Sequence, residues 1–108
     1  MTVRNITRIP DLIRIVKESP IPIILEIVNN RTASSDLSEF YRQLSQLFEG
    51  KVGFLSVNID RVPEILNIIR VQYLPTYVGF DKGEIIEALQ SPYPLQLKHF
   101  VEMMSRLI

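Results

Sequence analysis

The most constraining feature of this sequence is a nearly continuous apolar run at residues 21–28, which reads IPIILEIV. Most of its residues are β-branched, and such runs are typical of strands that are covered on both faces. Strands of this kind lie in the middle of a sheet that helices flank. Pro22 has no backbone N–H to contribute to a sheet, so it suits the beginning of the strand. The run therefore predicts a layered α/β domain.

Helical and strand patterns alternate on both sides of this run. Residues 37–48 carry the clearest helical pattern, an apolar stripe spaced by three and four residues, and Ser34 or Ser35 can cap its start. Asp81-Lys82-Gly83 lies between two strand patterns and is typical of a hairpin. The predicted elements are strands at 3–6, 21–28, 52–59, 76–80 and 85–88, and helices at 10–17, 37–48, 63–69 and 95–107. Their order predicts a single α/β domain over residues 1–108, a three-layer α/β/α sandwich with a central mixed sheet of about five strands.

The chain contains no cysteine and a single histidine, His99. The absence of cysteine excludes disulfides, thiolate metal sites and cysteine nucleophiles. One histidine is too few for most catalytic triads and for most histidine metal sites. We therefore expect neither a bound metal nor a cofactor.

The charges of the chain balance, with 12 Lys and Arg residues against 12 Asp and Glu residues. A neutral chain has little electrostatic attraction for nucleic acid or for an acidic membrane surface. No apolar run approaches the ~20 residues that span a bilayer, and the first residues lack the basic and apolar segments of a signal peptide. We expect a cytoplasmic protein with no membrane partner, and we regard a nucleic-acid partner as disfavoured.

Four short motifs resemble segments of the thioredoxin family and occur at the spacing of that family. They are GKV at 50–52, NID at 58–60 followed by Pro-Glu at 63–64, VQYLPT at 71–76, and FDKGE at 80–84. The resemblance covers essentially the whole chain. It implies a thioredoxin-like fold in which a cis peptide bond precedes Pro75, in a loop that contacts extended peptide substrates in that family.

The redox motif of the family is missing. Counting back from Gly50, the CxxC motif falls on residues 31–34, so that Arg31 replaces the attacking cysteine and Ser34 the resolving cysteine. Asn30 takes the place of the preceding tryptophan. Thiol–disulfide exchange needs a thiolate nucleophile, which neither replacement can supply. The resemblance is thus to a redox-inactive member of the family.

Glu26 is a possible buried acid. The triplet at residues 25–27 resembles the apolar–acid–aromatic strand of the family, which implies that Glu26 lies beneath the former active site. Helix spacing would instead place Leu25 there, and both registers remain open. A buried Glu26 must be protonated or paired, with Arg31 as a possible partner, whereas a Glu26 near the strand end would be solvated.

The fold that the resemblance implies brings distant segments together at the former active site. Tyrosine and arginine are enriched among interface anchors. Alternatively, Tyr73 covers the core, Arg31 is a solvated loop residue, and Ser34 is a helix cap rather than a nucleophile. The residues expected to bind a partner are Asn30, Arg31, Thr32, Tyr73, Leu74, Pro75 and Tyr93.

Three functions are compatible with these features. The first is a redox-inactive, protein-binding module, such as an adaptor, an assembly factor or a subunit of a complex. The second is a thiol-independent enzyme or an anion-binding protein that uses Arg31 and the following helix N-terminus, with Ser34 or Glu26. The third is a structural homodimer. The sequence shows no convergent acid, base and nucleophile, which favours the first function.

Overall fold

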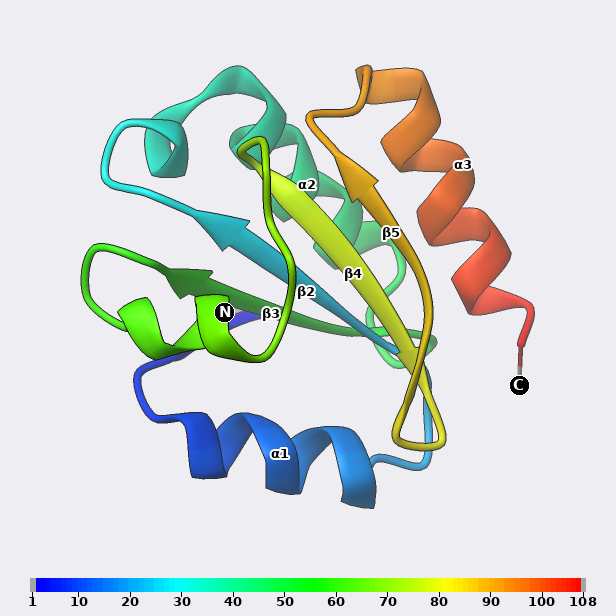
Figure 1. The fold of residues 1–108 in the computed structure, drawn as a ribbon. Coiled ribbons are helices and arrows are strands. Elements are labelled where there is room, and N and C mark those ends of the chain that lie inside the picture. The colour runs from blue at the N-terminus through cyan, green and yellow to red at the C-terminus, as the bar shows by residue number, and fades with distance from the viewer. Residues whose placement is uncertain (1, 108) are drawn as a thin grey trace.

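A mixed five-stranded sheet lies at the centre of the computed structural model, which describes residues 2–107 (Figure 1). The strand order is β1-β3-β2-β4-β5, with β1, β3 and β2 parallel and β4 antiparallel to both β2 and β5. The strands are β1 (Val3–Ile6), β2 (Ile23–Val28), β3 (Gly53–Asn58), β4 (Thr76–Asp81) and β5 (Glu84–Gln90).

Helices cover both faces of this sheet. Helix α1 (Ile9–Glu18) lies on one face, and α2 (Asp36–Leu47) and α3 (Pro94–Ser105) lie on the other (Figure 1). Two short 3₁₀ turns, η1 (Thr32–Ser34) and η2 (Pro63–Asn67), precede α2 and β4 respectively. The predicted three-layer α/β/α sandwich is confirmed.

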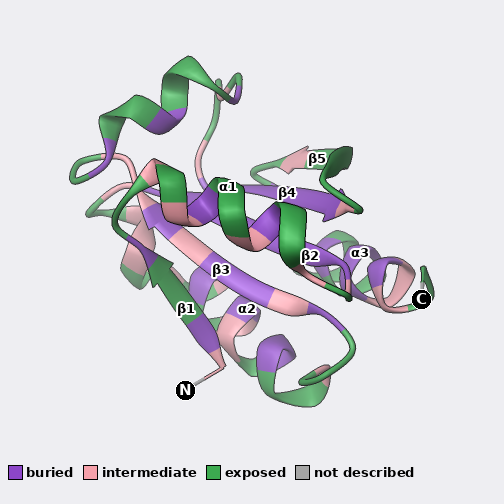
Figure 2. Ribbon diagram, turned by 90° about the horizontal axis from the view of Figure 1, so that it is seen from below, coloured by how far each residue is buried: buried purple, intermediate pink, exposed green. Residues whose placement is uncertain are grey.

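Strand β2 is buried along its whole length, as its apolar pattern predicts (Figure 2). Ile23, Leu25 and Ile27 contribute to the core beneath α1. The alternate side chains point to the opposite face, where Ile24 joins the core beneath α2 and α3. Because side chains alternate along a strand, Glu26 shares this second face.

The pairing of β2, β4 and β5 brings three loops to one end of the sheet. Ile27 of β2 pairs with Thr76 of β4, and Thr76 pairs with Gln90 of β5. The segment after β2, the segment before β4 and the segment after β5 therefore leave the sheet side by side. These are the segments that carry the residues predicted to bind a partner.

Some apolar positions differ from the sequence-based expectation. Leu47 belongs to the predicted stripe of α2, yet its side chain is 76% exposed at the end of the helix. The helix predicted at 63–69 is the shorter turn η2, because only Ile65 and Ile69 contact the core while Leu66 and Ile68 face solvent. Strand β5 is longer than predicted and mostly exposed, since it is an edge strand (Figure 2).

Candidate functional site

The segment that replaces the cysteine motif forms a compact turn before α2. The Asn29 side chain accepts a hydrogen bond from the backbone N–H of Thr32 at 2.8 Å, and the Thr32 hydroxyl accepts one from the backbone N–H of Asn29 at 2.9 Å. The Thr32 hydroxyl is therefore engaged within the turn. Arg31 is exposed at the beginning of η1, so its side chain is accessible.

The N-cap of α2 is Ser35. Its hydroxyl oxygen accepts a hydrogen bond from the backbone N–H of Ser38 at 3.2 Å. The hydroxyl of Ser34 instead lies 3.4 Å from the carbonyl oxygen of Arg31. Asp36 and Glu39 occupy the first turn, where the helix dipole favours negative charge.

We expect Ser35→Ala to lower the free energy of unfolding by about 1 kcal/mol, because one N–H at the start of α2 loses its acceptor. Ser34→Ala is the matched control and should change it by less than about 0.5 kcal/mol. Urea denaturation of both variants measures the difference. Equal effects of the two substitutions would contradict the assignment of the cap.

Asn30 is exposed but tied to the loop that follows β3. Its backbone N–H donates to Oδ2 of Asp60 at 2.8 Å, and its side-chain oxygen accepts a hydrogen bond from Nδ2 of Asn58 at 2.9 Å. A further hydrogen bond of 2.9 Å joins the backbone N–H of Asp60 to Oδ1 of Asn58. These contacts fix the loop after β2 against the loop after β3.

The loop before β4 presents an exposed aromatic side chain. Tyr73 is 64% exposed, so the alternative that it covers the core is wrong. The side-chain oxygen of Gln90 accepts hydrogen bonds from the backbone N–H groups of Gln72 at 2.8 Å and Tyr73 at 3.1 Å, which attaches the loop to β5.

The peptide bond between Leu74 and Pro75 is cis. Pro75 is buried, so its ring is not accessible to a partner, contrary to its inclusion among the predicted binding residues.

A second exposed tyrosine follows β5. Tyr93 is 78% exposed and precedes α3, where its backbone N–H donates to the side-chain oxygen of Gln96 at 2.8 Å. The neighbouring residue Ser91 has a φ of 46° and donates its backbone N–H to the carbonyl oxygen of Pro75 at 2.8 Å. The segment that bears Tyr93 is thus attached to the loop that bears Tyr73.

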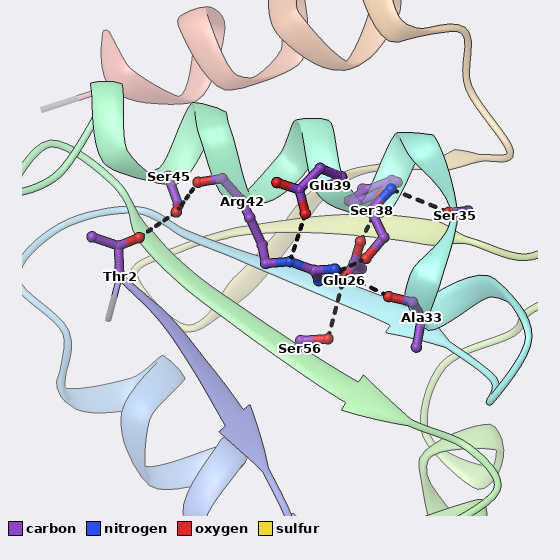
Figure 3. A network of polar contacts seen from close by, with 10 residues as sticks. Thr2, Glu26, Ala33, Ser35, Ser38, Glu39, Arg42, Ser45 and Ser56 are labelled. Atoms are coloured by element: carbon purple, nitrogen blue, oxygen red, sulfur yellow. Dashed lines mark hydrogen bonds and ion pairs between the residues drawn. The ribbon is translucent and has the colours of Figure 1, made fainter.

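Glu26 is buried, with 1% of its surface exposed. The hydroxyl of Tyr77 donates to Oε2 at 2.7 Å. The hydroxyl of Ser56 donates to Oε1 at 3.0 Å (Figure 3). Desolvation raises the pKa of the Glu26 carboxyl, an effect that hydrogen bonds from Tyr77, Ser38 and Ser56 and the charge of Arg42 oppose. The register with Glu26 as the buried acid is therefore the one that the structure has.

The cation near Glu26 is Arg42 on α2 and not Arg31, the partner that the sequence suggested. Arg42 donates from Nη1 to the Ser38 hydroxyl at 3.1 Å and from Nη2 to the carbonyl oxygen of Ala33 at 3.2 Å (Figure 3). Its Nε lies 3.5 Å from Glu39. The position of Arg42 one helical turn after Ser38, beside the apolar stripe, is the sequence signal that could have indicated this contact.

Other chemistry finds little support in the part of the chain that the structure describes. Residues 2–107 contain no group of three metal-ligating side chains. No helix within the same residues combines the length and apolar character that crossing a bilayer requires.

Several solved thioredoxins have a fold similar to that of this chain. A cysteine-to-serine mutant of Entamoeba histolytica thioredoxin matches with a TM-score of 0.84 and 20% identity over 94% of this chain and 98% of that chain. Malassezia sympodialis thioredoxin matches with a TM-score of 0.83 and 18% identity over 95% and 90% of the two chains. Plasmodium falciparum thioredoxin matches with a TM-score of 0.81 and 18% identity over 93% and 97%. The chain therefore has the thioredoxin-like fold, in a sequence that lacks cysteine.

No family model matches the sequence. Uncharacterized proteins of Mycobacterium tuberculosis and Mycobacterium bovis are 30% identical over 90 residues, which is 82% of this chain. The chain spans about 30% of the length of these curated relatives. The absence of cysteine in a thioredoxin-like fold argues against thiol oxidoreductase activity.

Proposed function

We propose that this protein binds another protein through the loops at the former redox site. The surface, called here the rim surface, consists of Asn30, Arg31, Thr32, Tyr73, Leu74 and Tyr93. The observation that carries the proposal is the presence of two tyrosines, 64% and 78% exposed, on two of the three loops that leave one end of the sheet. Exposed aromatic side chains beside an arginine are typical of interface anchors.

The backbone around Leu74 supports an extended segment as the bound element. Within the described residues 2–107, neither the N–H nor the C=O of Leu74 has a hydrogen-bond partner. By contrast, both backbone groups of Tyr73 and the C=O of Pro75 form hydrogen bonds. A free donor and acceptor on an exposed loop can pair with the main chain of a partner. The resemblance to thioredoxins points to the same mode of contact.

An anion site or a thiol-independent enzyme is less well supported. Asp36 lies in the first turn of α2, so a negative charge already occupies the place where an anion would bind. Within residues 2–107, the hydroxyl of Ser34 is directed to the carbonyl oxygen of Arg31 and forms no hydrogen bond to a side chain that could act as a base. Glu26, the other candidate, is enclosed by its own hydrogen bonds.

We expect Tyr73→Ala to weaken binding of the partner by about 2 kcal/mol or more, roughly a 30-fold rise in Kd, because an aromatic anchor is removed. The partner is first isolated by pull-down with the wild-type protein, and its Kd is then measured by titration calorimetry. Thermal stability should remain nearly unchanged, since Tyr73 is exposed.

Leu47→Ala is the matched control for this experiment. Leu47 is exposed to a similar degree, at 76%, but lies at the far end of α2 from the three loops. A partner whose Kd responds to neither substitution, or only to Leu47→Ala, would refute the rim surface. If wild-type protein alone elutes as a dimer and Tyr73→Ala as a monomer, the bound protein is a second copy of the chain.

A further inference from the structure

A row of polar side chains crosses three strands on the face of the sheet that α2 covers. Asn5 of β1 pairs with Ser56 of β3, and Ser56 pairs with Glu26 of β2. Two residues earlier on the same strands, the equivalent row is Val3, Phe54 and Ile24, all of which are buried in the core. On each of the three strands, the side chain on this face thus changes from apolar to polar between one pair of neighbouring positions and the next.

This row lies towards the carboxyl ends of three adjacent parallel strands. Loops and helix N-termini converge there in open α/β sheets, and ligands collect there for that reason. Asn5 is exposed and Ser56 is half-buried, but Glu26 is almost fully buried and must find its hydrogen-bond partners away from bulk water, which weakens the core. A buried carboxyl group in such a row is therefore more readily explained by binding than by stability.

A cavity of about 460 Å³ opens over the polar row, a volume within the usual range of small-molecule sites. The sheet forms one wall, and Ser38 and Arg42 of α2 form another (Figure 3). Arg61, from the loop after β3, contributes to the lining and is exposed. Glu26 lines the cavity while being almost fully buried, so that it lies at the base and the exposed Arg61 at the mouth.

The charges of the lining restrict what can bind. A simple anion attracted by the arginines would meet the carboxyl group of Glu26 at the base. A simple cation would be repelled by the two guanidinium groups in the lining, those of Arg42 and Arg61. A small molecule with an ammonium group at one end and a carboxylate at the other satisfies both ends of the cavity.

We propose that this cavity binds a free α-amino acid. The ammonium group donates to the side-chain oxygens of Ser56 and Asn5 and is attracted by the charge of Glu26, which lies beneath them with both carboxyl oxygens already hydrogen-bonded. The carboxylate accepts from Arg61. Arg42 is already committed to Ser38, Ala33 and Glu39 within the described chain, so it shapes the wall. The site is separate from the rim surface and does not depend on it.

The test is a nuclear magnetic resonance titration of the full chain with each of the standard free L-amino acids. We expect at least one to bind with a Kd of about 1 mM or tighter and to shift the amide signals of Asn5, Glu26 and Ser56. Acetate and methylammonium, which are the two halves of glycine, should each bind at least about tenfold more weakly. The proposal would be overturned if no amino acid bound, or if acetate or methylammonium alone bound as tightly as the amino acid.

Substitutions that remove a charge but nearly keep the size of the side chain test whether the amino acid binds in this cavity or elsewhere on the protein. Glu26→Gln and Arg61→Gln should each raise the Kd about tenfold or more, because each removes one charge that the zwitterion needs. Arg70→Gln is the control, since Arg70 is exposed and does not line the cavity. Tyr73→Ala should leave amino-acid binding unchanged, so that loss of the rim function and loss of this site are separable. Unaltered binding to both Glu26→Gln and Arg61→Gln would refute the assignment.

Discussion

Tyr41→Ala is expected to lower the free energy of unfolding by about 4 kcal/mol, the largest effect of any substitution considered for this protein. Tyr41 on α2 is completely buried and packs against Phe54 and Tyr77, with ring centroids 5.5 and 5.0 Å away. Its hydroxyl lies 2.9 Å from the carbonyl oxygen of Ile24 and 2.8 Å from that of Leu55. Truncation therefore creates a cavity and also removes the hydrogen-bond donor that joins α2 to β2 and β3.

Tyr41→Phe separates these two contributions. It keeps the ring and should reduce the free energy of unfolding by about 1 kcal/mol, the net value of a buried hydrogen bond. Burial raises the pKa of the Tyr41 hydroxyl, so it stays protonated and can donate at any ordinary pH. The control is Tyr73→Phe, which alters an exposed hydroxyl. Chemical denaturation that finds Tyr41→Phe as stable as the wild type would contradict this role of the hydroxyl.

Glu26→Gln is expected to increase the free energy of unfolding at pH values above the raised pKa of Glu26, where burial of an ionised carboxylate is most unfavourable. Glutamine has nearly the same shape and can keep hydrogen bonds with Tyr77 and Ser56. The reason for the gain is the desolvation of the carboxylate, which raises its pKa in the folded state above its ordinary value.

The pH dependence of stability has a defined sign. Above a pH of about 4.5 the unfolded chain releases the Glu26 proton, whereas the folded chain retains it until the raised pKa is reached. The folded state thus binds more protons in this window, and its stability falls as the pH rises through it. The advantage of Glu26→Gln should therefore grow as the pH rises from about 4.5 through the raised pKa, as measured by thermal denaturation. An advantage that shrinks over this range would contradict the raised pKa.

Most of the fold could be predicted from the sequence. The run at residues 21–28 is buried strand β2, and the alternating helical and strand patterns around it occur as predicted. These predictions rest on local periodicity and on proline and glycine positions, which act within a few residues. The element that differs is η2, where apolar residues are present but only part of them can reach the core.

The candidate sites were less predictable because they depend on contacts between distant segments. The sequence suggested Arg31 as the partner of Glu26, but Arg42 is the cation that approaches it, through Ser38. The residue pairs of the polar row are tens of positions apart along the chain, and only strand register aligns Asn5, Ser56 and Glu26. A shift of one residue would turn these side chains to the other face of the sheet.

The amino-acid sequence by itself determined that residues 1–108 carry no thiol group, since that depends only on the presence of cysteine. It also determined the order of helices and strands, because local patterns specify them. Only the tertiary structure decided that Glu26 is buried and Tyr73 exposed, because burial depends on which distant segments cover a side chain. It likewise decided that the loops bearing Arg31, Tyr73 and Tyr93 leave the same end of the sheet, since strand pairing sets that geometry.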